Sequence, residues 1–101
     1  VRAEGLARAG SDWSLSLPDV NVIRARAGVS TMSSVTADQF LAERGREMFQ
    51  EATRRQDLIR FDKWGAAWWE KPVSQAYRKL FPIPFDAIQA SGGSLTQNTG
   101  Y

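Results

Sequence analysis

The 101-residue chain contains no cysteine and no histidine. The lack of thiols excludes a disulfide scaffold, a zinc–thiolate site and a cysteine nucleophile, and the lack of imidazole excludes every histidine-dependent catalytic triad. A metal site made of carboxylates alone stays open, but no acidic loop has the spacing that binds calcium. We therefore predict no metal site and no cofactor.

Long apolar runs and an excess of one charge are also missing. No run approaches the roughly twenty apolar residues that span a bilayer, and no signal peptide is visible. Thirteen Lys and Arg stand against eleven Asp and Glu, with the signs interspersed, whereas a nucleic-acid interface needs uncompensated positive charge. We expect no nucleic-acid partner. Because Val1 already lies in a helical pattern, we also expect a piece of a longer protein.

Helical periodicity is what the first third of the chain does contain. Residues 1–10 place alanines and a leucine at helical spacing and end on Gly10, a residue typical of a helix C-terminus. Ser16 is a candidate N-cap for a second helix that ends at Gly28. Two short helices joined by a brief turn predict a helical hairpin of the tetratricopeptide-like type.

A third helix is predicted by a capping box formed by Thr36 and Gln39, and it should run to about Ala52. A second box, Thr53 with Gln56, should start a further short helix. The apolar side of the third helix consists of Leu41, Gly45, Met48, Phe49 and Ala52.

The last forty residues are irregular. Glycine, proline and three tryptophans between Asp62 and Pro82 predict a long ordered loop, followed by an extended stretch to Pro84 and a helical turn that contains Phe85. No segment has the alternation of a β-strand. The predicted fold class is all-α: a tetratricopeptide-like helical hairpin plus further helices and a long irregular C-terminal region.

Three glutamates on the third helix raise the question of catalysis. Glu43, Glu47 and Glu51 follow each other at four-residue steps, and a glycosidase needs two carboxyl groups about 5 to 9 Å apart across a cleft. Arginines within reach favour neutralisation instead, since half-buried carboxylates are normally paired. We predict no catalytic residue and a structural ion-pair network made of Arg44, Glu47, Glu51, Arg54 and Asp57.

The tryptophans of the loop allow two interpretations. Their faces could stack on the apolar face of a sugar, or they could fix the loop onto the helices, which is the interpretation we favour. Trp68 and Trp69 are sequence neighbours, so in an extended loop they point to opposite sides and one can anchor while the other faces outward. These two are the candidate ligand-binding residues.

Four sequence blocks occur in one order along the chain. They read NVIRARAGV, ERGREMFQEATRRQDLIRFDKWG, LFPIPFDAIQA and LTQNTGY. Together they resemble the C-terminal part of the SusD/RagB family of outer-membrane nutrient-binding lipoproteins. Three positions depart from the family pattern: Ala52 replaces a glycine, Ala87 an acid and Thr99 a proline. The first departure predicts that any left-handed corner before the fourth helix is relaxed, and the third predicts a less stiff chain end.

The resemblance implies a function without catalysis. Residues 1–101 would be the C-terminal module of a longer cell-surface protein that binds an oligosaccharide or similar nutrient and delivers it to a TonB-dependent, SusC-like outer-membrane transporter. Membrane association would come only from an N-terminal lipid anchor outside this chain. A tetratricopeptide-like protein-interaction module is the alternative, and an acid–base hydrolase a more distant one. A lipoprotein signal encoded upstream in the full gene, together with an adjacent transporter gene, would favour the nutrient-binding function.

Overall fold

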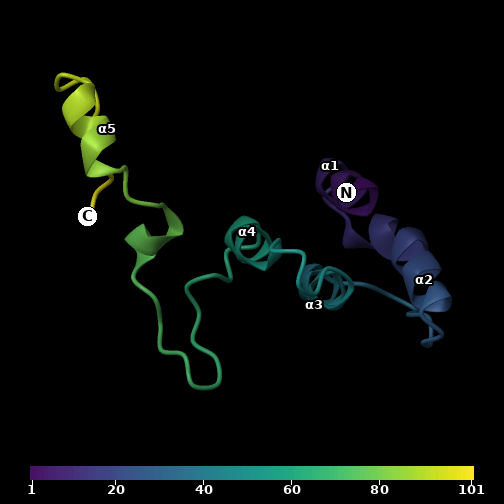
Figure 1. Ribbon diagram of the computed structural model, residues 1–101. Coiled ribbons are helices and arrows are strands. Elements are labelled where there is room, and N and C mark those ends of the chain that lie inside the picture. The colour runs from purple at the N-terminus through teal and green to yellow at the C-terminus, as the bar shows by residue number, and fades with distance from the viewer. The chain divides into compact units, whose positions relative to one another are not determined.

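The computed structural model describes residues 1–101, which divide into two units, Val1–Phe61 and Asp62–Tyr101 (Figure 1). All regular elements are helical, and the one β feature is an isolated bridge between Trp68 and Lys71. This confirms the all-α class. None of the helices has the length and apolar character needed to cross a membrane.

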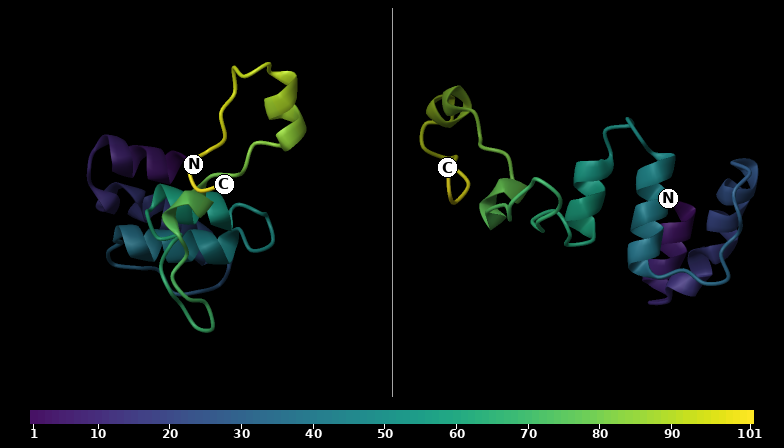
Figure 2. Two further views of the ribbon diagram at one scale, coloured as in Figure 1. Left: turned by 90° about the vertical axis from the view of Figure 1, so that its left-hand side faces the viewer. Right: turned by 90° about the horizontal axis from the view of Figure 1, so that it is seen from below.

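The first unit contains the predicted hairpin. Helix α1 (Arg2–Ala9) and helix α2 (Leu17–Arg26) are joined by the 3₁₀ turn η1 (Trp13–Ser16), and Figure 2 shows the two helices close together. Ser16 does precede α2, but its hydroxyl donates to the carbonyl of Trp13 at 2.6 Å and does not cap the helix. The 3₁₀ turn directly before α2 engages this side chain first.

The ends of the two hairpin helices differ. Gly28 is left-handed (φ +70°), and the N–H of Val29 donates to the carbonyl of Arg24 at 3.0 Å, as in a Schellman motif. Gly10, in contrast, keeps a right-handed φ of −88°, and Ser11 takes the left-handed position (φ +51°). Helix α1 therefore ends at Gly10 as predicted, but the left-handed residue that follows it is Ser11, whereas after α2 it is the glycine itself.

Helix α3 (Ala37–Glu47) begins at the predicted capping box. The N–H of Gln39 donates to the Thr36 hydroxyl at 3.2 Å, and the Gln39 side chain accepts the N–H of Thr36 at 2.8 Å. The helix ends five residues before Ala52 because Gln50 (φ +65°) and Ala52 (φ +58°) turn the chain into the left-handed region.

Helix α4 (Arg54–Arg60) is present, but the capping box predicted for it is wrong. Thr53 has right-handed helical dihedrals, φ −90° and ψ −16°, whereas a capping residue needs an extended backbone to aim its hydroxyl at the first turn. The Thr53 hydroxyl is buried and has no hydrogen-bond partner.

The core of the first unit is aromatic. The ring of Trp13 lies 5.2 Å from that of Phe40 and 5.3 Å from that of Phe61, and Phe40 packs with the buried Val20 and Val35. Phe49, which the periodicity placed on the apolar side of α3, is 75% exposed because the helix has already ended there.

The second unit consists of a long loop with a 3₁₀ turn η2 (Ala76–Lys79), an extended stretch and helix α5 (Phe85–Ala90). Its C-terminal tail is bound to the extended stretch by side chains. The Gln97 amide pairs with both backbone groups of Ile83, accepting from its N–H at 2.8 Å and donating to its carbonyl at 2.9 Å. Two further bonds to this stretch run from Asn98 to the Phe81 carbonyl and from the Tyr101 hydroxyl to the Leu80 carbonyl.

Candidate functional site

A chain of five charged side chains ties α1, α3 and α4 together. Arg8 donates to Glu4 at 2.9 Å, and Arg60 bridges Glu4 and Asp57 at 2.8 Å each. Arg44 completes the chain by donating to the other oxygen of Asp57 at 2.8 Å. We call this set, Arg8–Glu4–Arg60–Asp57–Arg44, the five-residue ion chain. The Asp57 side chain is 1% exposed, so its two arginine partners replace the water that burial removes.

A second cluster joins α2 to α3. Glu43 is buried and accepts from Arg24 at 2.7 Å and from Arg46 at 2.5 Å. Burial by itself would raise the pKa of Glu43, but the hydrogen bonds and positive charges of Arg46 and Arg24 outweigh it and hold the pKa below its ordinary value. One turn further along, Arg26 pairs with Glu47.

The structure brings together only some members of the predicted ion-pair network. Arg44 and Asp57 contact each other, whereas Glu47 pairs with Arg26 of α2. Arg54 donates to the carbonyl of Leu41 at 2.9 Å, and Glu51 is exposed in the turn after α3. The guanidinium of Arg54 also lies against Gly45, where a Cβ atom would approach its Nη1 to 2.7 Å.

Sequence reasoning missed Glu4, Arg8 and Arg60 as members of the five-residue ion chain. Glu4 and Arg8 are four residues apart on α1, a spacing that favours an ion pair. Arg60 reaches Glu4 across 56 residues of sequence, and no local pattern gives that contact.

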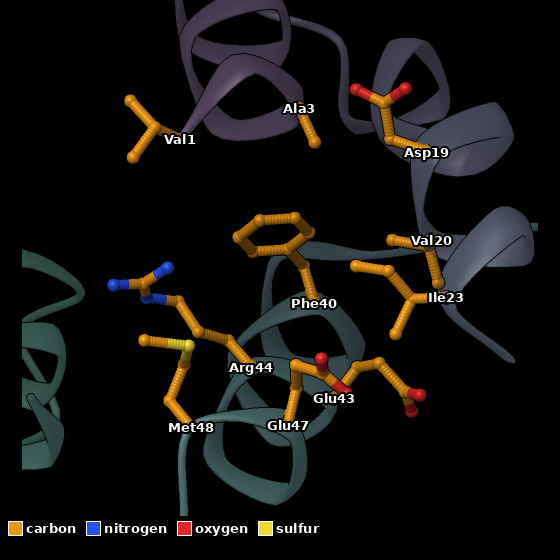
Figure 3. Close-up of a pocket in the computed structure, with 10 residues that line it drawn as sticks. All are labelled: Val1, Ala3, Asp19, Val20, Ile23, Phe40, Glu43, Arg44, Glu47 and Met48. Atoms are coloured by element: carbon orange, nitrogen blue, oxygen red, sulfur yellow. The ribbon is translucent and has the colours of Figure 1, made fainter. Parts of the chain in front are cut away.

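A cleft opens between α1, α2 and α3, with the Phe40 ring pointing into it (Figure 3). Its volume is about 230 Å³. Three carboxylates line it, and each is paired with arginine: Asp19 with Arg2, Glu43 with Arg24 and Arg46, and Glu47 with Arg26. This pairing fits structural carboxylates and leaves none of the three as an uncompensated acid or base. No group of three or more acidic side chains is close enough to hold a metal ion.

The two candidate tryptophans lie on a tight turn of the second unit. The N–H of Trp68 donates to the carbonyl of Lys71 at 3.1 Å, and the N–H of Lys71 donates back at 2.9 Å, so Trp69 and Glu70 form the tip. Glu70 adopts φ +59°, a conformation that side chains disfavour. Trp68 is 55% and Trp69 86% exposed. Neither ring is buried, so the turn does not use Trp69 as an anchor.

The SusD family model matches residues 1–78 of this chain. The chain belongs to the SusD family. Over its whole length, its sequence is 33% identical to the starch-binding protein SusD of Bacteroides thetaiotaomicron, of which it covers 19%. Its fold superimposes on the surface glycan-binding protein A from Bacteroides thetaiotaomicron with a TM-score of 0.77 and 30% identity, covering 96% of this chain and 22% of that one. The chain thus spans about a fifth of each of these relatives.

Two residues of the sequence blocks in this SusD-family chain, Asn21 and Gln97, use their side-chain amides to bind the backbone of another segment. The Asn21 amide accepts the N–H of Met32 at 2.8 Å and donates to the carbonyl of Met32 at 2.9 Å. Gln97 treats Ile83 in the same way. We call each of these an amide clamp, because one side-chain amide pairs with both backbone groups of one distant residue.

Ala52, which replaces a glycine of the family pattern, was expected to relax the corner before α4, and this prediction is wrong. The corner before α4 is not relaxed, since Ala52 itself adopts the left-handed conformation with φ +58°. The hydrogen bonds of the flanking arginines, Arg44 to Asp57 and Arg54 to the Leu41 carbonyl, hold α3 and α4 in place across the turn. The corner is kept and the alanine is strained by it.

Proposed function

We propose that this chain is the C-terminal module of a longer protein that binds glycans at the cell surface without transforming them. The observation that supports it most is the alignment of the whole chain, at 33% identity, with a starch-binding protein of the same family. The fold likeness to a surface glycan-binding protein, at a TM-score of 0.77, supports it independently of that alignment.

The delivery step belongs to the same proposal. A protein of this family would pass the captured oligosaccharide, or a similar nutrient, to a TonB-dependent, SusC-like transporter in the outer membrane. A lipid anchor at the start of the longer protein would hold it at the cell surface. The network of charged residues within this chain would have no part in either step except to keep the helices together.

The absence of catalysis is proposed on chemical grounds. Hydrolysis of a glycosidic bond needs one carboxyl group with a raised pKa as acid, and a second one as base or nucleophile. The buried Glu43 has a lowered pKa, and Asp57 is shared between Arg44 and Arg60. Charge pairing of this kind suits stability better than proton transfer.

Binding and delivery can be tested separately. Calorimetric titration of the full-length protein with a panel of oligosaccharides should give saturable heat for at least one glycan, with the glycan recovered unchanged. Purification of the tagged protein from outer membranes should bring a TonB-dependent transporter with it. If no glycan binds and a soluble protein partner is recovered, the tetratricopeptide-like interaction module becomes the better description.

A further inference from the structure

The cleft between α1, α2 and α3 has mainly apolar walls. Six apolar side chains line it: Val1, Ala3, Val20, Ile23, Phe40 and Met48. Ala3, Ile23 and Met48 are only half-buried, and Figure 3 shows them around the Phe40 ring. Val1 is 99% exposed. Much of this apolar surface faces a space of about 230 Å³, and covering it with further apolar atoms would stabilise the fold.

The charged side chains at the cleft are already neutralised within the chain. Its three carboxylates pair with arginines, as described above, and the guanidinium of Arg44 donates to Asp57 at 2.8 Å. A charged ligand would therefore find no uncompensated charge of opposite sign, and it would lose hydration against the apolar walls. An apolar occupant would gain from those walls without that cost.

Helix α1 begins beside this cleft without a capping signal. Its N-cap is Val1, whose side chain makes no capping hydrogen bond, and valine is a poor residue at this position. Helix α3, in contrast, begins at the capping box of Thr36 and Gln39. The carbonyl of Val1 already accepts the N–H of Gly5 at 3.0 Å, in the pattern of an α-helix. These residues therefore carry no signal that would keep a preceding segment from continuing the helix.

We propose that the cleft is filled by the segment that directly precedes Val1 in the longer protein, folded as a continuation of α1. This rests on the proposed function, which makes the chain the C-terminal module of a protein about as long as relatives of which it spans a fifth. Ala3 lines the cleft, and helical residues at three- and four-residue steps share one face. The residues four and seven positions before Ala3 should therefore face the cleft and be apolar.

Covalent connection favours this occupant over a second copy of the protein. Val1 itself lines the cleft, so the segment attached to it is held beside the apolar walls at a high effective concentration. A separate molecule would first have to lose its freedom of translation and rotation.

Thiol labelling of the full-length protein tests the inference, because residues 1–101 contain no cysteine of their own. Ile23→Cys places a thiol on the wall of the cleft. Val22→Cys is the matched control at the neighbouring position, which is 70% exposed. Ile23→Cys should react with a soluble maleimide at least about tenfold more slowly than Val22→Cys, because a covered thiol reacts only when the structure opens locally. A smaller difference would mean that the cleft stays accessible, and it would overturn the inference.

A second pair of variants identifies the occupant. Aspartate in place of the residue four positions before Ala3 would put a charge into the cleft and should make the labelling of Ile23→Cys fast. Aspartate five positions before Ala3 lies on another side of the continued helix and should leave the labelling slow. Protection of Ile23→Cys that the first aspartate leaves unchanged would overturn the inference. Protection that grows with protein concentration would do the same, since it would assign the cleft to a second copy.

Failure of this inference can be told from failure of the proposed function. Fast labelling of Ile23→Cys in a full-length protein that binds an oligosaccharide would overturn the inference and leave glycan binding intact. Slow labelling in a full-length protein that binds no glycan would overturn the proposed function and leave the inference intact.

Discussion

The interactions that stabilise the first unit of this chain differ from those that stabilise the second. All buried residues belong to the first unit, which has an aromatic core, the five-residue ion chain and the Glu43 cluster. The second unit has no buried residue and keeps its form through hydrogen bonds from side chains to backbone, above all from Gln97, Asn98 and Tyr101.

This difference shows where each kind of interaction is effective. A buried carboxylate is costly unless it is paired, and the pairs of the first unit therefore specify which helices meet. In the second unit the backbone is exposed, and each clamp contributes only the modest net free energy of hydrogen bonds made in competition with water. A mutation that removes one of these interactions in the first unit should lower the stability of that whole unit. A mutation of the same kind in the second unit should loosen only the segment around it.

The largest expected effect is at Asp57. Replacing it by alanine removes the carboxylate partner of Arg44 and leaves Arg60 paired with Glu4 alone. The free energy of unfolding should therefore fall by about 3 kcal/mol. Chemical denaturation of the full-length protein measures this. Glu51→Ala, on an exposed carboxylate, is the control and should change stability by less than about 0.5 kcal/mol. Equal losses of stability in the two variants would contradict the stabilising role of the ion pairs of Asp57.

The two amide clamps allow a matched comparison between the units. Asn21→Ala removes two hydrogen bonds to the backbone of Met32, and Gln97→Ala removes two to the backbone of Ile83 and one from the N–H of Asn98. Each change should cost about 1 to 2 kcal/mol where it acts. Asn21→Ala should lower the global unfolding midpoint. Gln97→Ala should leave the midpoint in place and accelerate hydrogen exchange at the Ile83 amide. A global effect of Gln97→Ala would show that the second unit is not held locally.

A smaller effect of opposite sign is expected at the corner between α3 and α4. Ala52→Gly should stabilise the protein by about 1 kcal/mol, because glycine adopts φ +58° without the steric cost that alanine bears. Ala42→Gly, in the middle of α3, should destabilise by about the same amount. Thermal unfolding of both variants provides the check, and destabilisation by Ala52→Gly would mean that the corner is not strained.

The smallest expected effect is a pH dependence at Glu43. Its pKa is lower in the folded state than in the unfolded chain, so the folded state stays charged where the unfolded state begins to take up a proton. The stabilisation is complete above the ordinary glutamate pKa of 4.5 and is lost as the pH falls through the lower folded-state value. Urea midpoints from pH 6 to pH 3 should therefore fall less steeply in Glu43→Gln than in the unchanged protein. If the urea midpoints of the two proteins fall in parallel with pH, Glu43 does not contribute to the pH dependence of stability.

The sequence predicted the features that depend on near neighbours. The all-α class, the hairpin, the Thr36–Gln39 capping box and the end of α2 before Gly28 follow from spacing and from single-residue preferences. The early end of α3 did not follow, since Ala52 adopts a conformation that its side chain disfavours and only tertiary contacts can impose.

Contacts between residues far apart in the sequence could not be predicted from residue spacing either. The pairing of Glu4 with Arg60 and the packing of Trp13 on Phe40 and Phe61 depend on how the helices fold back. At the candidate site, the sequence named Trp68 and Trp69 but could not tell exposure from anchoring. That distinction required the turn geometry and the position of Lys71.

Our central proposal is that the buried charges of the first unit maintain the fold and take no part in binding a glycan. It is tested most directly by measuring the unfolding free energy and the affinity for a bound oligosaccharide together in the full-length Asp57→Asn variant. The account predicts that Asp57→Asn lowers stability and leaves the affinity of the folded protein for the oligosaccharide unchanged. Lost affinity together with unchanged stability in Asp57→Asn would contradict it.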